Sequence, residues 1–129
     1  MSRWRRSGRP VMAEPLIAEP LDAEDAKLVT LARSTRARSG TAEGAAVRDT
    51  DGRTYAAATV ALPSVRLSAL QLAVAMAASS GVDGLEAAAL VSSGSTVDSG
   101  GLAAVRDLGP VAPVILADVD GAVHEIVRP

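Results

Sequence analysis

Side chains that commonly perform chemistry are scarce in this sequence. It contains no cysteine and a single histidine, His124. The absence of cysteine excludes disulfides, thiolate catalysis and any zinc site built on cysteine. His124 stands beside Glu125, but one histidine and one carboxylate do not complete a zinc site, and alternation along a strand would place them on opposite faces. We therefore interpret His124 as an exposed strand residue.

The remaining reactive residue types support weak hypotheses. Ser68 or Ser99 could act as a nucleophile, but each would need a base, and the single histidine is far away in sequence. The glycine-rich stretch 92–101 precedes a helix and could hold an anion on free N–H groups, although it lacks the lysine of a P-loop. Asp118 and Asp120 could bind a cation weakly, but turn chemistry explains both.

The composition favours a small core that is completed by association. The chain has 129 residues, which is the length of one domain, and it contains no phenylalanine. Tyr55 is the one aromatic residue outside the N-terminal segment, so the core must consist of alanine, valine and leucine. Such side chains bury little area each, at roughly 25 cal/mol per Å². We therefore expect a marginal monomer and a homo-oligomer.

Charge and hydropathy indicate which classes of partner and which cellular location to expect. The net charge of −2 gives no general reason to expect nucleic acid or an anionic membrane. All basic residues except Lys27 are arginine and alanine is abundant, which is typical of a GC-rich (actinobacterial-type) genome. No apolar run approaches the ~20 residues of a membrane span. The N-terminal arginines are not followed by the apolar segment of a signal peptide. The sequence therefore predicts a cytoplasmic, soluble protein with no membrane contact.

Residues 1–21 differ from the rest of the chain. They begin with a basic cluster and then repeat an A-E-P-L phrase that contains Pro15 and Pro20. Because proline disrupts helices and removes a donor, we predict a disordered or loosely extended arm. Weak contact with nucleic acid could come from the residues Arg3, Trp4, Arg5, Arg6 and Arg9. The simpler interpretation of this arm is an untethered leader.

Apolar periodicity and turn signals predict a domain over residues 22–129 with the order α, β, β, α, β, α, β, β. The first helix should run from its cap Asp22 to about Arg38 and end at Gly40. The other helices are expected at residues 66–81 and about 100–108, and the strands at 44–48, 53–61, 85–92, 114–117 and 122–127. This alternation favours a three-layer α/β/α domain with a mixed five-stranded sheet.

The helix expected at residues 66–81, RLSALQLAVAMAASSG, is apolar on nearly every face. A surface helix has one apolar stripe, so this composition predicts a helix that is buried on several sides.

Several phrases in this order resemble the small homo-oligomeric cytidine deaminases over about residues 24–127. The family has an L-x-x-x-A-R helix, an F-P-V-G-A-A strand, a D-G-R-x-Y turn and a P-V-I-L-A-x-x-D-G strand. The matching residues here are Leu28–Arg33, Gly44–Ala46, Asp51–Tyr55 and Pro113–Ala117 with Asp120-Gly121. The resemblance implies the α/β/α fold and a homodimer or homotetramer whose sites are shared between subunits.

The chemistry that this resemblance implies is absent. The family uses zinc to activate a water and a carboxylate to move protons, from a C-A-E phrase and a P-C-x-x-C phrase. The first phrase falls on Ser68 to Leu70, so that serine replaces a ligand and leucine replaces the acid. The second falls near residues 98–102, where Ser99 and Leu102 replace the other ligands. We therefore expect a degenerate member with no zinc or other cofactor.

The substrate clamp of the family also changes. Its N-V-E-N phrase falls on residues 59–62, where Thr59 and Ala61 replace the asparagine and the glutamate. The phenylalanine of F-P-V-G-A-A is Thr41, which removes the aromatic ring on which a base could stack.

Our leading hypothesis is a catalytically inactive, homo-oligomeric binding module, with an unidentified protein partner left open. The alternatives are a nucleoside deaminase with an altered site and a metal-free binder of nucleosides or nucleotides.

Overall fold

The computed structural model describes residues 21–129, so the N-terminal arm with its arginines and Trp4 lies outside the described residues. The helices are α2 (Ala23–Ser39), α3 (Ala69–Ser79) and α4 (Ser99–Leu108). The strands are β1 (Gly44–Asp49), β2 (Thr54–Ala58), β3 (Val60–Ala61), β4 (Arg66–Leu67), β5 (Leu85–Val91), β6 (Val114–Ala117) and β7 (Val123–Val127).

Five of these strands form one mixed sheet in the order β2-β1-β5-β6-β7. The β5–β6 pair is parallel and the other pairs are antiparallel. A parallel pair needs a crossover, which α4 supplies between β5 and β6. The strands β3 and β4 form a separate two-stranded hairpin.

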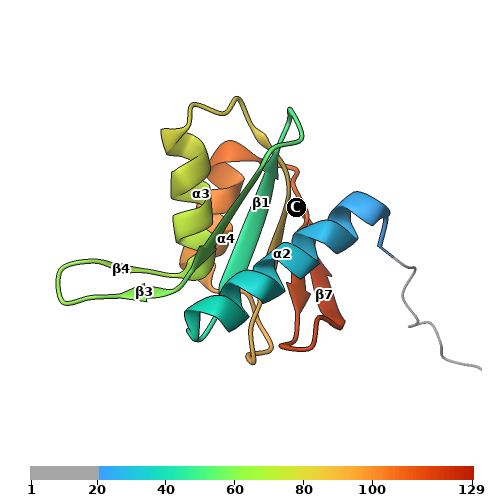
Figure 1. Ribbon diagram of the computed structural model, residues 1–129. Helices are drawn as coiled ribbons and strands as arrows, with labels where there is room; N and C mark the ends of the chain where they lie inside the picture. The colour runs from blue at the N-terminus through green and yellow to red at the C-terminus, as the bar shows by residue number, and fades with distance from the viewer. Residues whose placement is uncertain (1–20) are drawn as a thin grey trace, which may run out of the picture.

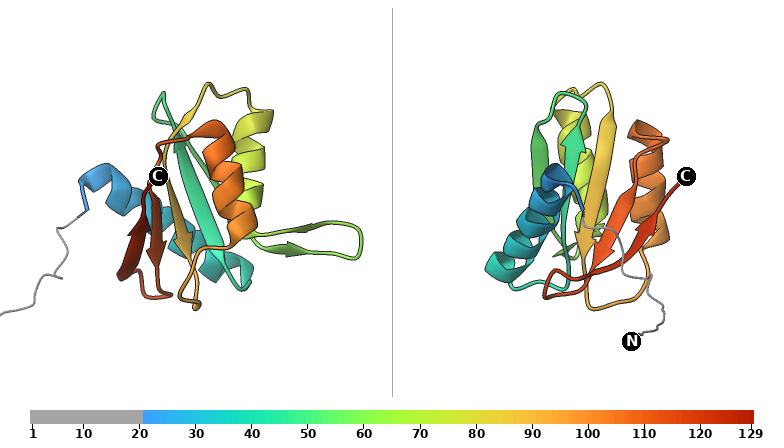
Figure 2. Two further views of the ribbon diagram at one scale, coloured as in Figure 1. Left: turned by 180° about the vertical axis from the view of Figure 1, so that it is seen from behind. Right: turned by 90° about the vertical axis from the view of Figure 1, so that its right-hand side faces the viewer.

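The helices cover both faces of the sheet and make three layers. Helix α2 crosses the front of the sheet in Figure 1, and α3 and α4 lie in front in the reverse view of Figure 2. Each interface has its own apolar core, one centred on Leu28 and Ile115 and the other on Leu70 and Leu90. The predicted α/β/α class with a mixed five-stranded sheet is confirmed.

Local signals place α2 as the sequence predicts. The Asp22 carboxylate accepts a hydrogen bond from Asp25 N at 2.8 Å and caps the first turn. The helix ends at Gly40, whose φ of 67° is left-handed. The missing side chain of Gly44 then lets α2 approach β1, since a Cβ there would lie 2.7 Å from Arg36 N and against the carbonyl of Ala32.

The segment between β1 and α3 departs from the prediction. The single strand expected at 53–61 is divided at Thr59 into β2 and β3, because the chain leaves the main sheet there. The helix expected from residue 66 begins at Ala69 instead, since Arg66 and Leu67 pair with Ala61 and Val60. The result is a hairpin that projects away from the body of the domain (Figure 1).

The burial of α3 also differs from the prediction. Its buried residues are Ala69, Leu70, Ala73, Val74 and Ala77, which form one face toward the sheet and α4. On the outer face Met76 is 40% exposed, so residues 21–129 do not cover the helix on several sides. In residues 21–129 no helix has the length and apolarity needed to cross a membrane.

Candidate functional site

The first turns of α3 and α4 meet at one end of the domain. Leu70 in α3 is fully buried, and Gly101 in α4 lies directly against it. A Cβ at Gly101 would lie 2.9 Å from Leu70 Cβ, which is closer than side-chain carbons pack. The structure therefore brings two of the expected helix starts together and fills the space between them with the leucine.

Ser68 is committed to capping α3. Its Oγ accepts a hydrogen bond from Gln71 N at 3.0 Å, and Gln71 Oε1 accepts one from Ser68 N at 3.0 Å. This reciprocal pair is a capping box, and the spacing Ser-x-x-Gln is its sequence signal. This role of Gln71 is not among the sequence predictions. The side chains of Ser68 and Gln71 thus satisfy one backbone donor each at the helix start.

Helix α4 is capped in a similar way. The Oδ2 atom of Asp98 accepts a hydrogen bond from Gly101 N at 2.7 Å. Ser99 is the first residue of the helix and its side chain is exposed, whereas Leu102 is partly buried against the core that contains Leu70. Ser99 and Leu102 therefore do not converge on a common centre as polar groups.

Two of the three residues expected at the substrate site, Thr41 and Thr59, bind the same backbone carbonyl. Thr41 Oγ1 donates to the Glu43 carbonyl at 3.1 Å, and Thr59 N donates to the same oxygen at 3.2 Å. Ala61 is exposed in β3, on the projecting hairpin. The two threonines thus close the start of β1 against the end of β2, while the alanine points to a different part of the surface.

Glu43 and Ser92 form a polar contact that the sequence did not reveal. Ser92 Oγ donates to Glu43 Oε2 at 2.9 Å and accepts from Gly94 N at 3.0 Å. The two residues are 49 positions apart and meet because β1 pairs with β5. In the stretch 92–101, which could hold an anion, the N–H of Gly94 is therefore already bonded to Ser92, and the Glu43 carboxylate lies beside it. The negative charge of this carboxylate disfavours the binding of an anion.

A family model described as cytidine deaminase-like matches residues 21–121 of this chain. The chain belongs to the cytidine deaminase-like family. Solved structures agree with this assignment at the level of the fold. The cytidine deaminase of Burkholderia pseudomallei has a TM-score of 0.69 and 21% identity, over 79% of this chain and 90% of that chain. The cytidine deaminase of Mycobacterium leprae has a TM-score of 0.63 and 18% identity, over 74% and 89%. No curated protein sequence matches the chain.

The zinc that the resemblance implies does not fit the residues of this cytidine deaminase-like chain. Zinc requires several cysteine, histidine or carboxylate ligands at one point. Among residues 21–129 no three side chains of these types come together. At the two helix starts Ser68 and Asp98 already bind backbone N–H groups, and Leu70 offers no ligand atom. We derive no chemical step through zinc.

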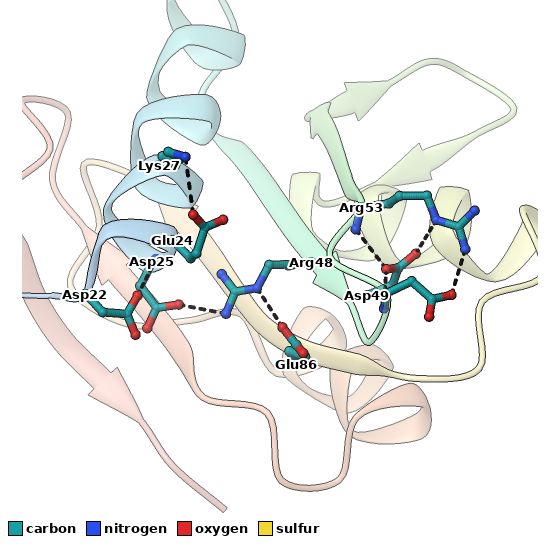
Figure 3. A network of polar contacts seen from close by, with 9 residues as sticks. Asp22, Glu24, Asp25, Lys27, Arg48, Asp49, Arg53 and Glu86 are labelled. Atoms are coloured by element: carbon teal, nitrogen blue, oxygen red, sulfur yellow. Dashed lines mark hydrogen bonds and ion pairs between the residues drawn. The ribbon is translucent and has the colours of Figure 1, made fainter.

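The strongest polar clusters of the domain lie elsewhere (Figure 3). Arg48 on β1 donates to Glu86 Oε1 at 2.8 Å and to Asp25 Oδ1 at 3.0 Å, which fastens α2 to the sheet. Burial would lower the pKa of Arg48, but these two carboxylates outweigh burial and raise it. These ion pairs connect α2, β1 and β5.

The second cluster surrounds Asp49 at the β1–β2 turn. Asp49 is 1% exposed and accepts hydrogen bonds from Asp51 N, Arg53 N, Arg53 Nε and Tyr55 Oη. Burial would raise the pKa of Asp49, but these donors outweigh burial and hold it below its usual value. Burial and the hydrogen bond to Asp49 raise the pKa of Tyr55. The carboxylate therefore fixes both the turn and the tyrosine ring.

The remaining candidates have structural roles. Asp118 Oδ1 accepts from Asp120 N at 2.9 Å and from Ala122 N at 3.1 Å, which is the expected turn chemistry. His124 is exposed on the edge strand β7, as predicted.

An open hollow of about 450 Å³ lies on the surface beside the outer face of α3. It is lined by Tyr55, Leu72, Ala75, Met76, Ser79 and Ser80. These residues are apolar or carry a hydroxyl group and none is charged, so the hollow suits an apolar protein segment better than a phosphate or an ion.

Proposed function

We propose that this chain is a non-catalytic, cytidine deaminase-like module that acts as a homo-oligomer through its surfaces. The buried first turns of α3 and α4 then stabilise the fold, and the exposed apolar surface binds other copies of the chain. A cytoplasmic location and a further protein partner remain predictions.

One observation carries the proposal: Leu70 is fully buried against Gly101 at the place where the family resemblance implies a metal and an acid. A hydrolytic deaminase must activate a water and must move protons to the base. Leucine can do neither, and a buried leucine stabilises the helix contact by roughly 1.5–3 kcal/mol. The cap of α3 supports the same reading, since Ser68 stands where the resemblance implies a zinc ligand and its side chain binds the backbone of the helix start.

We expect the purified full chain to hold far less than one zinc ion per chain and to leave cytidine unchanged. The physical reason is the missing ligand set at the two helix starts. Elemental analysis after expression in zinc-supplemented medium measures the metal, and loss of cytidine absorbance measures deamination. The deaminase of Mycobacterium leprae, prepared in parallel, is the positive control. Stoichiometric zinc together with turnover would establish the altered deaminase instead.

We also expect a dimer or tetramer of the 13.0 kDa chain in light scattering at micromolar concentration. Among residues 21–129, Met76 at 40% exposure, Leu62 at 56% and Val65 at 46% leave apolar area uncovered. A small alanine-rich core gains stability when such area is buried. A monomer across the micromolar range contradicts the homo-oligomer.

Thermal stabilisation by cytidine or a nucleotide would favour the metal-free binder.

A further inference from the structure

Among residues 21–129, the β3–β4 hairpin is an arm whose tip, residues 61–66, is exposed. It is paired at its base, Val60 with Leu67, and closed at its tip, where Leu62 N donates to the Val65 carbonyl at 2.9 Å. The views of Figures 1 and 2 agree that it points away from the domain. A two-stranded hairpin is at best marginally stable in water, so an arm with exposed Leu62 and Val65 needs a surface to pack on.

The hollow beside α3 offers such a surface, but at the other end of the helix. The arm joins α3 at its first turn, directly before the cap Ser68. The hollow is lined by Leu72 and by residues toward the C-terminal end, up to Ser80. The arm points away from the body in Figures 1 and 2, and none of its residues is among those that line the hollow. Two α3 helices that pack antiparallel about a twofold axis would bring the start of one helix to the end of the other.

Charges at the two ends of α3 favour the same arrangement. Arg66 on the arm and Asp83, shortly after the end of α3, are exposed and have no ion-pair partner among residues 21–129. The last turn of α3 carries no basic residue, although a helix C-terminus attracts a cation. An arginine supplied by a second chain would complement both the helix end and the aspartate.

We propose that the β3–β4 arm of one chain inserts the apolar tip formed by Leu62 and Val65 into the hollow beside α3 of a second copy, and that the second copy does the same in return. The inference rests on the homo-oligomer proposed above and names its contact. Met76 fits this role because a flexible thioether adapts its shape to the inserted side chains. Arg66 then lies toward Asp83 of the other chain.

Directed cross-linking tests the contact, because the natural chain has no cysteine. Full-length Leu62→Cys is mixed with full-length Met76→Cys under mild oxidation. We expect a covalent heterodimer to form about a hundredfold faster than with the control pair Val111→Cys and Met76→Cys, since a docked pair has a millimolar effective concentration. Val111 is a matched control because it is 76% exposed and lies outside the arm and the hollow. Equal rates for the two mixtures overturn the proposal.

Association measurements supply a second readout. Leu62→Asp should raise the dissociation constant of the oligomer at least ~tenfold, as the loss of a central apolar anchor does, while Val111→Asp leaves it unchanged. Arg66→Glu and Asp83→Arg should each raise it about two- to fivefold, and the two substitutions combined in one chain should restore it. Circular dichroism verifies that each variant is folded.

The outcomes separate this inference from the proposed function. A wild-type chain that is monomeric overturns the homo-oligomer and the arm contact together. An oligomer that survives Leu62→Asp and lacks the cross-link between positions 62 and 76 overturns the arm contact alone. A disulfide within one chain of the Leu62→Cys, Met76→Cys double variant would place the arm on its own hollow and also overturn the exchange.

Discussion

Leu70→Glu is expected to destabilise the domain by roughly 3–5 kcal/mol at pH 8, because it buries a charge with no partner. Leu70 is fully buried in the core between α3, α4 and the sheet. The first turn of α4 packs directly on this residue, since a Cβ at Gly101 would lie 2.9 Å from Leu70 Cβ. The free energy of unfolding in urea, measured from pH 5 to pH 8, checks this expectation.

The pH dependence of that variant has a definite sign. A buried carboxyl has a native-state pKa above its unfolded value, so the native state favours the protonated form. The cost of Leu70→Glu should therefore be smallest below the unfolded pKa and grow as the pH rises. Leu70→Met, which conserves volume, is the control and should cost less than ~1.5 kcal/mol at every pH. A Leu70→Glu variant as stable as the wild type at pH 8 would mean that the site is a wet pocket.

The sequence predicts the main elements because each has a strong local signal. Asp22 and Gly40 mark the two ends of α2, and the Asp51-Gly52 pair marks the β1–β2 turn. The apolar runs at β5 and β6 predict the central strands, which are buried on both faces. Each of these signals lies within a few consecutive residues, so it can be recognised in a single sequence.

The projecting arm was not predicted because its signals are ambiguous. Proline commonly stands just before a helix, so Pro63 and Ser64 indicate a chain break ahead of the helix expected from residue 66. They form the tip of a hairpin instead, where Leu62 N donates to the Val65 carbonyl. Strands of two residues are too short for an alternating pattern, and their apolar side chains have no core of their own.

For the candidate site, the sequence predicts which positions differ from the family but not which residues contact each other. Comparison with family phrases predicts that Ser68 and Leu70 are replaced positions, and the structure shows that Leu70 is buried. What occupies the site depends on contacts between distant segments. The contact of Leu70 with Gly101 and that of Glu43 with Ser92 join residues more than thirty positions apart, as their numbers show. No local pattern predicts which of these residues will meet.

Asp49→Ala is expected to lower the thermal midpoint by roughly 10 °C, since four hydrogen bonds to a buried carboxylate are lost. Asp49 Oδ1 accepts from Asp51 N and Arg53 N at 2.9 Å, and Oδ2 accepts from Tyr55 Oη at 3.0 Å. Asp49→Asn should cost less, because an amide oxygen still accepts from the two backbone groups. Asp51→Asn is the matched control: its side chain is 65% exposed and loses one surface ion pair with Arg53.

The pH dependence of Asp49 runs opposite to that of Leu70→Glu. The native-state pKa of Asp49 lies below its ordinary value of 3.8, because hydrogen bonds to the carboxylate outweigh burial. Its stabilisation is therefore complete at neutral pH and is lost as the pH falls through 3.8 toward the lower native value. Thermal melts of wild type and Asp49→Asn should converge at acid pH and separate at neutral pH. A gap that is constant with pH would mean that the charge of Asp49 contributes nothing.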